Sequence, residues 1–374
     1  MKLAVPRETA AGETRVAATP ESVRKFKGLG LDVAVEAGAG ARARIADADY
    51  EAAGAAIAPD AATVLADADI VLKVRGASAA EIPLLKKGAV LAALLAPHSE
   101  QAAIAGLAGQ GVTAFAMELL PRISRAQSMD VLSSQANLAG YKAVIDAAAR
   151  FCRAMPMMMT AAGTIAPARV LVMGVGVAGL QAIATAKRLG AIVSATDVRP
   201  ATKEQVESLG GTFVAVMDEE FRNAQTAAGY AKPMSAEYQA KQAALIAETI
   251  KKQDIVITTA LIPGRKAPTL VSAEMIESMK PGAVIVDLAA ERGGNTELTE
   301  PGKTIETPNG VRIFAPLNLA GTIAVNASSL YARNLLAFLE TMIDKKEKTL
   351  AINWDDEIIK GAAVTRDGQS VARG

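Results

Sequence analysis

The sequence predicts an α/β fold, and two observations support this class. Short apolar runs typical of buried strands alternate with helical segments through the first and second thirds of the 374-residue chain. In the second third, the glycine pattern G-x-G-x-x-G stands between a strand and a helix. Together they predict two Rossmann-like, doubly wound parallel-sheet domains with a cleft between them.

The first third of the chain begins this alternation. The helix over 19–30 is the clearest, because Thr19 can cap it, Pro20 opens its first turn and Gly28 and Gly30 end it. Strands are expected over 2–5, 32–38, 69–74, 88–96 and 111–118, with a further helix over 47–55.

The second third repeats the same order. After residue 320, one long helical stretch is followed by a charged tail, which we expect to pack back on the first domain. The expected domains are therefore 1–135 plus 321–374, an N-terminal α/β domain with a returning helix, and 136–320. Strands are expected over 169–174, 192–197, 212–216, 254–262 and 281–289, and helices over 178–190, 202–211, 235–253 and 324–343.

Composition argues against several classes of protein. A net charge of +1 gives no basic field, so nucleic acid is not an expected partner. The single cysteine, Cys152, fits a reducing compartment, and with the single histidine, His98, it cannot form a metal cluster, so we expect no metal. Mean hydropathy is +0.24, but no run of about 18 apolar residues lacks charges, so any membrane contact must go through a partner.

The glycine pattern has the parts of a dinucleotide site. Gly174 permits the tight turn, Gly176 lets a pyrophosphate approach the backbone, and Gly179 lets the helix pack close to the sheet. The helix start, near Val177, offers unpaired N–H groups to the phosphates. The alternative is an empty Rossmann-like domain, against which the surrounding strand, helix and acidic residue argue.

Asp197 ends the next strand, about 20 residues after the turn. A carboxylate there accepts hydrogen bonds from the ribose 2′-hydroxyl and repels a 2′-phosphate, which favours NAD(H). Arg199 weakens this inference, because an arginine could pair with that phosphate, and Asp197 could instead only cap the next helix. We expect Asp197, Val198 and Arg199 to contact the cofactor.

The segments VLVMGVGVAGLQAIATAKRLGAIVSATDVR, TTALIPG and MKPGAVIVDLA resemble the alanine dehydrogenase and proton-translocating nicotinamide nucleotide transhydrogenase family. VPRE and GETRVAATPESV near the amino terminus fit the same family, so the resemblance covers nearly the whole chain. The sharpest match is MELLPRISRAQSMDVLSSQANLAGYKAV, which is similar to the NAD(H)-binding component, domain I of the transhydrogenase alpha subunit.

The resemblance also separates the two branches of this family. Alanine dehydrogenases hold the substrate carboxylate with an arginine and a lysine, which Arg15 and Lys73 match. The place of their catalytic histidine holds Leu95, and that of their aspartate holds Glu291. Leucine cannot exchange a proton, so deamination of alanine is not expected. His98 is expected to be an ordinary surface residue.

The segment RISRAQSMD, residues 122–130, is unusually polar for this chain. The resemblance implies that it lines the nicotinamide site, where Arg122, Asp130 and Ser133 bond the carboxamide and ribose and Gln127 reaches toward the partner's nucleotide. Hydride transfer requires the protein to orient and approach the ring, which suits amides and fixed charges. The alternative is a solvated connection before the next helix.

The interval 217–236 is long, polar and short of core residues, and we interpret it as a mobile loop. The family has a loop that closes over NAD(H) with a tyrosine at its tip, matched by Gly229 and Tyr230. The alternative is disorder with an incidental tyrosine. Leu261 is expected beneath the nicotinamide, and Met157–Met159 are expected to pack beside the cleft.

The expected site residues fall into two groups. The expected catalytic residues are Arg122, Gln127, Asp130, Ser133 and Tyr230. The expected cofactor-binding residues are Gln127, Ser128, Met129, Asp130, Gly174, Gly176, Val177, Gly179, Asp197, Val198, Arg199, Gly229 and Leu261. The segment 317–328 carries less charge than the family segment.

The resemblance implies the NAD(H)-binding subunit of a proton-translocating NAD(P)+ transhydrogenase, an oxidoreductase. Hydride would pass directly between NAD(H) here and NADP(H) on a partner subunit, and a membrane-spanning component would couple it to proton translocation. We expect a homodimer, cytoplasmic and peripheral to the inner membrane through its partners. The alternatives are an alanine dehydrogenase-like amino-acid oxidoreductase and a non-catalytic NAD-sensing module, against which Gln127 and Asp130 argue.

Overall fold

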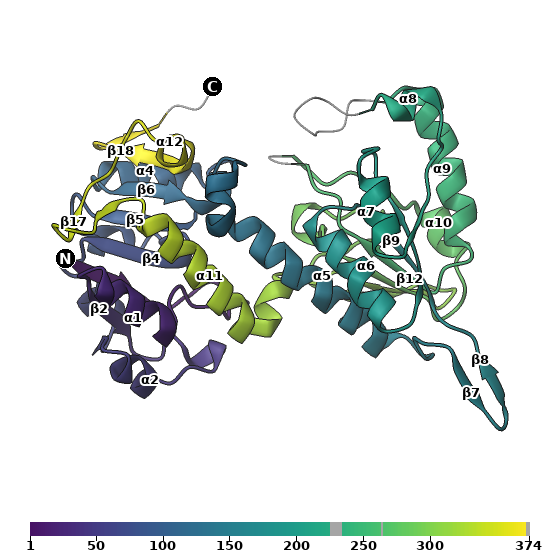
Figure 1. Ribbon diagram of the computed structural model, residues 1–374, viewed down its shortest axis with the longest axis horizontal. Coiled ribbons are helices and arrows are strands. Elements are labelled where there is room, and N and C mark those ends of the chain that lie inside the picture. The colour runs from purple at the N-terminus through teal and green to yellow at the C-terminus, as the bar shows by residue number, and fades with distance from the viewer. Residues whose placement is uncertain (225–233, 263–264, 372–374) are drawn as a thin grey trace. The chain divides into compact units, whose positions relative to one another are not determined.

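The computed structural model describes residues 1–224, 234–262 and 265–371. The chain divides into two compact units (Figure 1). Unit 1 combines Met1–Gln135 with Ala320–Gly374, and unit 2 is the continuous segment Ala136–Leu319. Both contain a mostly parallel sheet between helices, so the predicted fold class is confirmed for each unit.

Unit 1 contains an eight-stranded sheet. Strands β1 to β6 pair in parallel, whereas β18 and β19 add an antiparallel edge beside β6. The order is β19 (Gln369–Ser370), β18 (Ala363–Arg366), β6 (Thr113–Ala116), β5 (Val90–Leu94), β4 (Ile70–Arg75), β1 (Lys2–Val5), β2 (Asp32–Glu36) and β3 (Ala56–Ala58).

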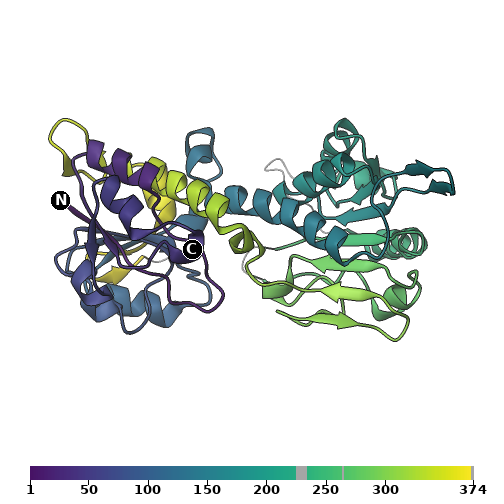
Figure 2. The same ribbon diagram turned by 90° about the horizontal axis from the view of Figure 1, so that it is seen from below.

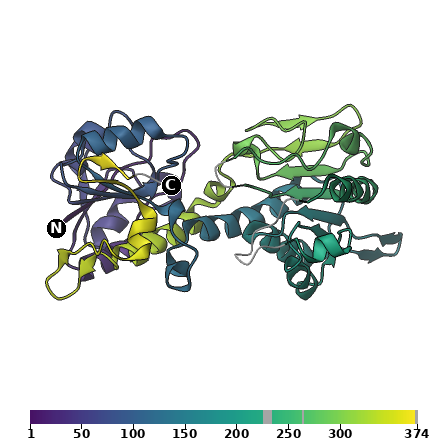
Figure 3. The same cartoon turned by 90° about the horizontal axis from the view of Figure 1, so that it is seen from above.

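Helices cover both faces of this sheet. In β4, Ile70 and Leu72 face one core and Val71 faces the other, because successive strand residues point to opposite faces. Figure 2 shows α1 beside α11, and Figure 3 shows α4 across the sheet from them. The helices of unit 1 are α1 (Pro20–Gly28), α2 (Asp47–Ala52), α3 (Ala61–Leu65), α4 (Gln101–Gly109), α11 (Ala324–Leu339) and α12 (Glu357–Ala362).

Helix α1 confirms the clearest helix prediction. Thr19 accepts a hydrogen bond from the Ser22 N–H, and the Ser22 hydroxyl accepts one from the Thr19 N–H, which forms a capping box. Pro20 occupies the first turn, and Gly30 follows the helix with a φ of 86°, which favours glycine.

Unit 2 contains a seven-stranded sheet that is parallel except at its last pair. Its order is β11 (Thr212–Phe213), β10 (Ile192–Thr196), β9 (Arg169–Met173), β12 (Ile255–Thr258), β13 (Val284–Asp287), β15 (Arg312–Phe314) and β14 (Thr304–Glu306). Chain order reverses between β9 and β12, which is the switch point where ligands of open α/β sheets bind.

Residues of α5, α6 and α7 pack on one face of the unit 2 sheet, and residues of α9 and α10 pack on the other. Helix α5 begins at Val131 in unit 1 and ends at Arg150 in unit 2. The bounds are α5 (Val131–Arg150), α6 (Val177–Arg188), α7 (Thr202–Ser208), α8 (Glu219–Arg222), α9 (Ala236–Ile250) and α10 (Ala273–Glu277).

Two small strand pairs stand outside the main sheets. Strands β16 (Ile343–Asp344) and β17 (Thr349–Leu350) pair in unit 1, and β7 (Met158–Thr160) and β8 (Gly163–Ile165) form a hairpin in unit 2. The side chains of Met157, Met158 and Met159, which we expected to pack beside the cleft, are exposed on or beside β7. An apolar run by itself does not distinguish a core strand from an exposed one.

Candidate functional site

The glycine pattern forms an open turn at the switch point of unit 2. Gly174 directly follows β9 with a φ of 101°, and a Cβ there would lie 2.7 Å from the Thr259 hydroxyl oxygen. A Cβ on Gly179 would lie 1.9 Å from the Gly174 carbonyl oxygen, so α6 can approach the strand only with glycine there. A Cβ on Gly176 would meet no described atom within 4 Å beyond its chain neighbours, so the backbone is open there.

The start of α6 fits a pyrophosphate. Gly176 is the N-cap, and no described side chain caps the helix, so its first N–H groups keep their capacity for a ligand. Val177, the first helical residue, is exposed. The helix has 12 residues, long enough for aligned peptide dipoles to favour an anion at this end. A dinucleotide therefore fits the residues that the structure places here.

Asp197 follows β10 and is held by several donors. Its Oδ2 accepts hydrogen bonds from the Val175 N–H at 2.7 Å and from Arg199 Nη2 at 2.9 Å. Its Oδ1 accepts from the Arg199 N–H and from Nε, both at 2.9 Å. The side-chain hydrogen bonds with Asp197 raise the pKa of the Arg199 guanidinium above its ordinary value, and burial opposes this. The carboxylate thus joins the glycine turn to the segment after β10, and neighbouring Val198 is exposed.

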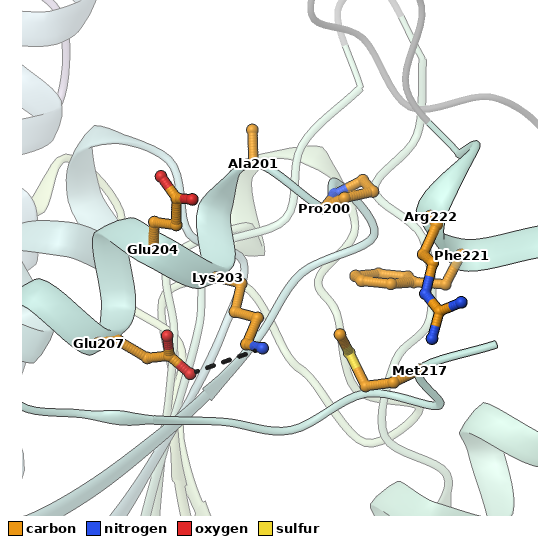
Figure 4. Close-up of a pocket in the computed structure, with 8 residues that line it drawn as sticks. All are labelled: Pro200, Ala201, Lys203, Glu204, Glu207, Met217, Phe221 and Arg222. Carbon is orange, nitrogen blue, oxygen red and sulfur yellow. Dashed lines mark ion pairs between the residues drawn. The ribbon is translucent and has the colours of Figure 1, made fainter. Parts of the chain in front are cut away.

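A hollow of about 510 Å³ lies beside this segment (Figure 4). In the figure, Met217 and Phe221 lie on one side of the hollow near Pro200, and Lys203 reaches toward Glu207, 3.9 Å away. Pro200, at the edge of the hollow, directly follows Asp197–Arg199 in the chain. The residues that line the hollow are Pro200, Ala201, Lys203, Glu204, Glu207, Met217, Phe221 and Arg222.

A buried polar network holds the segment after β12, and sequence reasoning missed it. The Asn295 side chain donates to the Ala260 and Pro268 carbonyl oxygens at 2.9 and 2.8 Å, and its Oδ1 accepts from the Ala260 N–H at 3.0 Å. The Asp287 carboxylate accepts from the Asn295 N–H at 2.7 Å. Leu261, which follows Ala260, is thereby presented with an exposed side chain.

In unit 1, the polar segment 122–130 is not an irregular loop but contains a 3-10 helix, η4 (Ser124–Met129). Asn334 on α11 donates to the Ser128 carbonyl oxygen at 2.8 Å and accepts from the Ser134 hydroxyl at 2.7 Å. Arg125 forms two hydrogen bonds, at 2.6 and 2.7 Å, with the Asp356 carboxylate. The carboxyl-terminal part of the chain therefore fixes this segment, a role for Asn334 that sequence reasoning missed.

The expected nicotinamide residues have different surroundings. Arg122, Gln127 and Ser128 are exposed and can reach a ligand. Asp130 and Ser133 are brought together, because the Asp130 carboxylate accepts from the Ser133 N–H at 2.9 Å and from its hydroxyl at 2.6 Å at the start of α5.

The remaining expected residues of this group are Met129, Gly229 and Tyr230. Met129 is 5% exposed and belongs to the core of unit 1. Gly229 and Tyr230 lie outside the described residues. At the near end of the interval expected to be a loop, Asp218 accepts a hydrogen bond from the Phe221 N–H and caps α8.

Arg15 and Lys73 are buried in unit 1 and paired with carboxylates of the chain. Arg15 Nε and Nη2 each donate to the Glu13 carboxylate at 2.7 Å. Burial raises the pKa of Glu13, but hydrogen bonds and charge from Arg15 outweigh it and lower that pKa to about 2. Lys73 Nζ lies 2.8 Å from Glu81 and 3.9 Å from Glu8. Both cations therefore already form ion pairs with carboxylates of the chain.

Burial also sets the protonation of Glu8. It raises the pKa of this carboxyl to about 7, against the opposing charge of Lys73 and hydrogen bonds from the Val74 and Arg75 N–H groups. Leu95, which is expected at the place of the dehydrogenase histidine, is buried in an apolar core.

His98, the single histidine, and Glu291, expected at the place of the dehydrogenase aspartate, lie at the surface. His98 is exposed, as expected. Glu291 is exposed and accepts a hydrogen bond from the Asn318 N–H at 2.7 Å. Among the described residues, no group of three or more metal-ligating side chains could hold an ion, and no helix is long and apolar enough to cross a membrane.

Known proteins resemble this chain along its whole length. The models for the alanine dehydrogenase/PNT N-terminal and C-terminal domains match residues 4–139 and 143–373. An NAD(P) transhydrogenase alpha-subunit chain of Rhodospirillum rubrum is 56% identical over 376 residues, covering 99% of this chain and 98% of that protein. A transhydrogenase crystal structure from Sinorhizobium meliloti has a TM-score of 0.91 at 58% identity, covering 99% and 100% of the two chains.

The dehydrogenase branch is more distant. A solved L-alanine dehydrogenase has a TM-score of 0.80 at 27% identity, covering 99% of this chain and 97% of that one. The chain therefore belongs to the alanine dehydrogenase/PNT family of oxidoreductases, and within it to the transhydrogenase alpha subunits.

Proposed function

We propose that this chain binds NAD(H) in unit 2 and exchanges hydride directly with NADP(H) held by a separate partner subunit. A membrane-spanning component would couple this exchange to proton translocation. The observation that carries the proposal is the open glycine turn at Gly176 before the uncapped start of α6. It offers backbone N–H groups to a pyrophosphate, and the chain's similarity to transhydrogenase subunits supports the reaction.

The bound nicotinamide supplies the hydride chemistry, so the protein residues have to orient and bind. Arg122 and Gln127 are exposed on the segment that Asn334 and Asp356 hold in place. We assign Arg122, Asp130 and Ser133 to the carboxamide and ribose of the nicotinamide end. We assign Gln127 to contact with the partner's nucleotide.

The same residues argue against the two alternatives. An alanine dehydrogenase-like reaction needs an acid/base where Leu95 is buried, and a carboxylate clamp where Arg15 and Lys73 already pair with carboxylates. A non-catalytic NAD sensor would not need Gln127 exposed on a rigidly held segment.

Partners and location follow from the same proposal. The chain would work with an NADP(H)-binding component and a membrane-spanning component, in the cytoplasm and peripheral to the inner membrane. We also propose a homodimer, which the exposed methionines of β7 support, since a second copy could cover that apolar surface.

The test is stopped-flow hydride transfer between NADPH on the partner component and an NAD+ analogue on this chain. Gln127→Asn keeps the amide but withdraws it by one methylene, and a misplacement of about 1 Å can lower the rate on the order of 100-fold. NADH affinity should stay nearly unchanged, because the loss acts in the transition state.

Ser124→Ala, an exposed change in the same 3-10 helix, is the matched control and should keep the full rate. A normal rate for Gln127→Asn would remove the proposed role of this segment. An unaltered chain that transfers no hydride in the presence of its partner would overturn the proposed function itself.

A further inference from the structure

The carboxylate of Asp197 has no free acceptor position, and this bears on which nucleotide can bind. A carboxylate offers about four acceptor sites. Two are used by the main-chain N–H groups of Val175 and Arg199, and two by Nε and Nη2 of the Arg199 guanidinium. A ribose hydroxyl can therefore bond Asp197 only by displacing one of these donors.

Of these donors only the guanidinium belongs to a side chain, and its Nη2 also donates to the Val175 carbonyl oxygen at 3.1 Å. The two N–H groups belong to the main chain, one of them in the glycine turn. The Arg199 side chain is 32% exposed, whereas that of Asp197 is 7% exposed. The guanidinium gives one bond to each carboxylate oxygen, and the 2′- and 3′-hydroxyls of a ribose can replace these two bonds in number.

We propose that Arg199 can bind a 2′-phosphate, but that its ion pair with Asp197 prevents this binding. The ion pair therefore sets the preference for NADH over NADPH. The proposal rests on the proposed binding of NAD(H) by unit 2. It makes Arg199 a specificity residue that acts through the carboxylate it pairs with.

The position of Arg199 supports this role. Its main-chain N–H stays bonded to Asp197 when the side chain moves, so the guanidinium remains beside the ribose. A planar guanidinium binds phosphate oxygens with two parallel hydrogen bonds, more strongly than a neutral donor. An incoming 2′-phosphate meets the Asp197 carboxylate, which repels it and competes for Arg199. Without that charge, Arg199 is free to bind the phosphate.

The experiment is calorimetric titration of the full chain with NADH and NADPH separately. Asp197→Asn should raise NADPH affinity about tenfold or more while lowering NADH affinity, since a charge-assisted bond is gained by one ligand and lost by the other. The double variant Asp197→Asn with Arg199→Gln should lose the NADPH gain. Asp197→Asn with Arg199→Lys should keep part of it, because the charge remains without the paired geometry.

The matched control is Asp197→Asn with Arg188→Gln, which removes an exposed arginine at the other end of α6 and should keep the whole gain. Circular dichroism checks folding, and Asp197→Ser replaces the asparagine variant if that one unfolds. A gain that survives Arg199→Gln, or no gain in a folded variant, would overturn the proposal. Failure of the unaltered chain to bind NADH would instead overturn the proposed function, and the NADPH titrations would still decide on Arg199.

Discussion

Units 1 and 2 share an architecture but treat the switch points of their sheets in opposite ways. In unit 1, chain order reverses between β1 and β4, and buried, mutually paired charges lie within β4 and in the segments that follow the two strands. These are Lys73 in β4, Glu8, Glu13 and Arg15 after β1, and Glu81 after β4. In unit 2, order reverses between β9 and β12, and the turn there is glycine with open backbone. The same fold is therefore closed by its own side chains in one unit and open to a ligand in the other.

The two switch points differ in their polar groups, which are charged side chains in unit 1 and main-chain N–H groups in unit 2. Lys73 is 2% exposed and Arg15 is 4% exposed, so each needs a carboxylate partner within the protein. The N–H groups at the start of α6 carry no full charge and remain accessible, so they keep their capacity for an anion. Three sets of substitutions test this contrast.

The largest effect is expected from Lys73→Met. It leaves the buried carboxylate of Glu81 without its partner at 2.8 Å, and breaking a buried pair costs about 3–5 kcal/mol of unfolding free energy. Urea denaturation measures this, and NADH affinity of the folded variant should not change. Lys86→Met removes an exposed pair with Asp69 and should have a much smaller effect. Equal losses of unfolding free energy in the two variants would show that the buried ion pair of Lys73 does not stabilise unit 1 more than an exposed pair does.

A smaller effect is expected from the glycines of unit 2. Gly179→Ala places a Cβ 1.9 Å from a carbonyl oxygen, so the backbone must shift at a cost of about 2–3 kcal/mol. Gly176→Ala meets no described atom within 4 Å beyond its chain neighbours, and its φ of −82° suits alanine. It should leave the melting temperature unchanged and weaken NADH binding. Unchanged NADH affinity would argue against phosphate binding at this turn.

The smallest effect concerns pH. The pKa of Glu8 is raised to about 7 in the folded state, against 4.5 for the ordinary group. The folded protein therefore keeps a proton that the unfolded chain releases, so stability falls as pH rises through this window. The fall should be about 2 kcal/mol between about pH 5.5 and 8.

Glu8→Gln should flatten this part of the stability profile, measured by urea denaturation at several pH values. The pKa of Glu13 is lowered to about 2, so that carboxylate contributes stability lost only below about pH 4.5 and does not interfere. An unchanged slope in the variant would assign the pH dependence to another group.

The parts of the fold that the sequence predicts depend on near neighbours. The strands β9 and β12 are short apolar runs, and α1 carries its own cap and stop signals within 12 residues. The glycine turn is also local, because each glycine has a role that its spacing reveals.

The remaining features depend on contacts between distant residues. Asn334 bonds Ser128 across 206 positions, and β18 joins β6 although the tail carries no strong strand pattern. The ion pair between Arg199 and Asp197 joins residues that are close in the sequence. The spacing of the two residues, however, is equally compatible with an arginine that is not paired. Only side-chain positions distinguish the two, which is why sequence reasoning left that choice open.

The pairing of β18 with β6 also affects the order in which the two units can fold during synthesis. Unit 2 is one continuous segment, so its sheet can form as soon as residue 319 has left the ribosome. The first segment of unit 1 is made before unit 2, but β18 and Asn334 emerge only after unit 2. During synthesis the edge of β6 and the segment around Ser128 therefore lack their partners, and chaperones have their clearest target in the half of the chain that was made first.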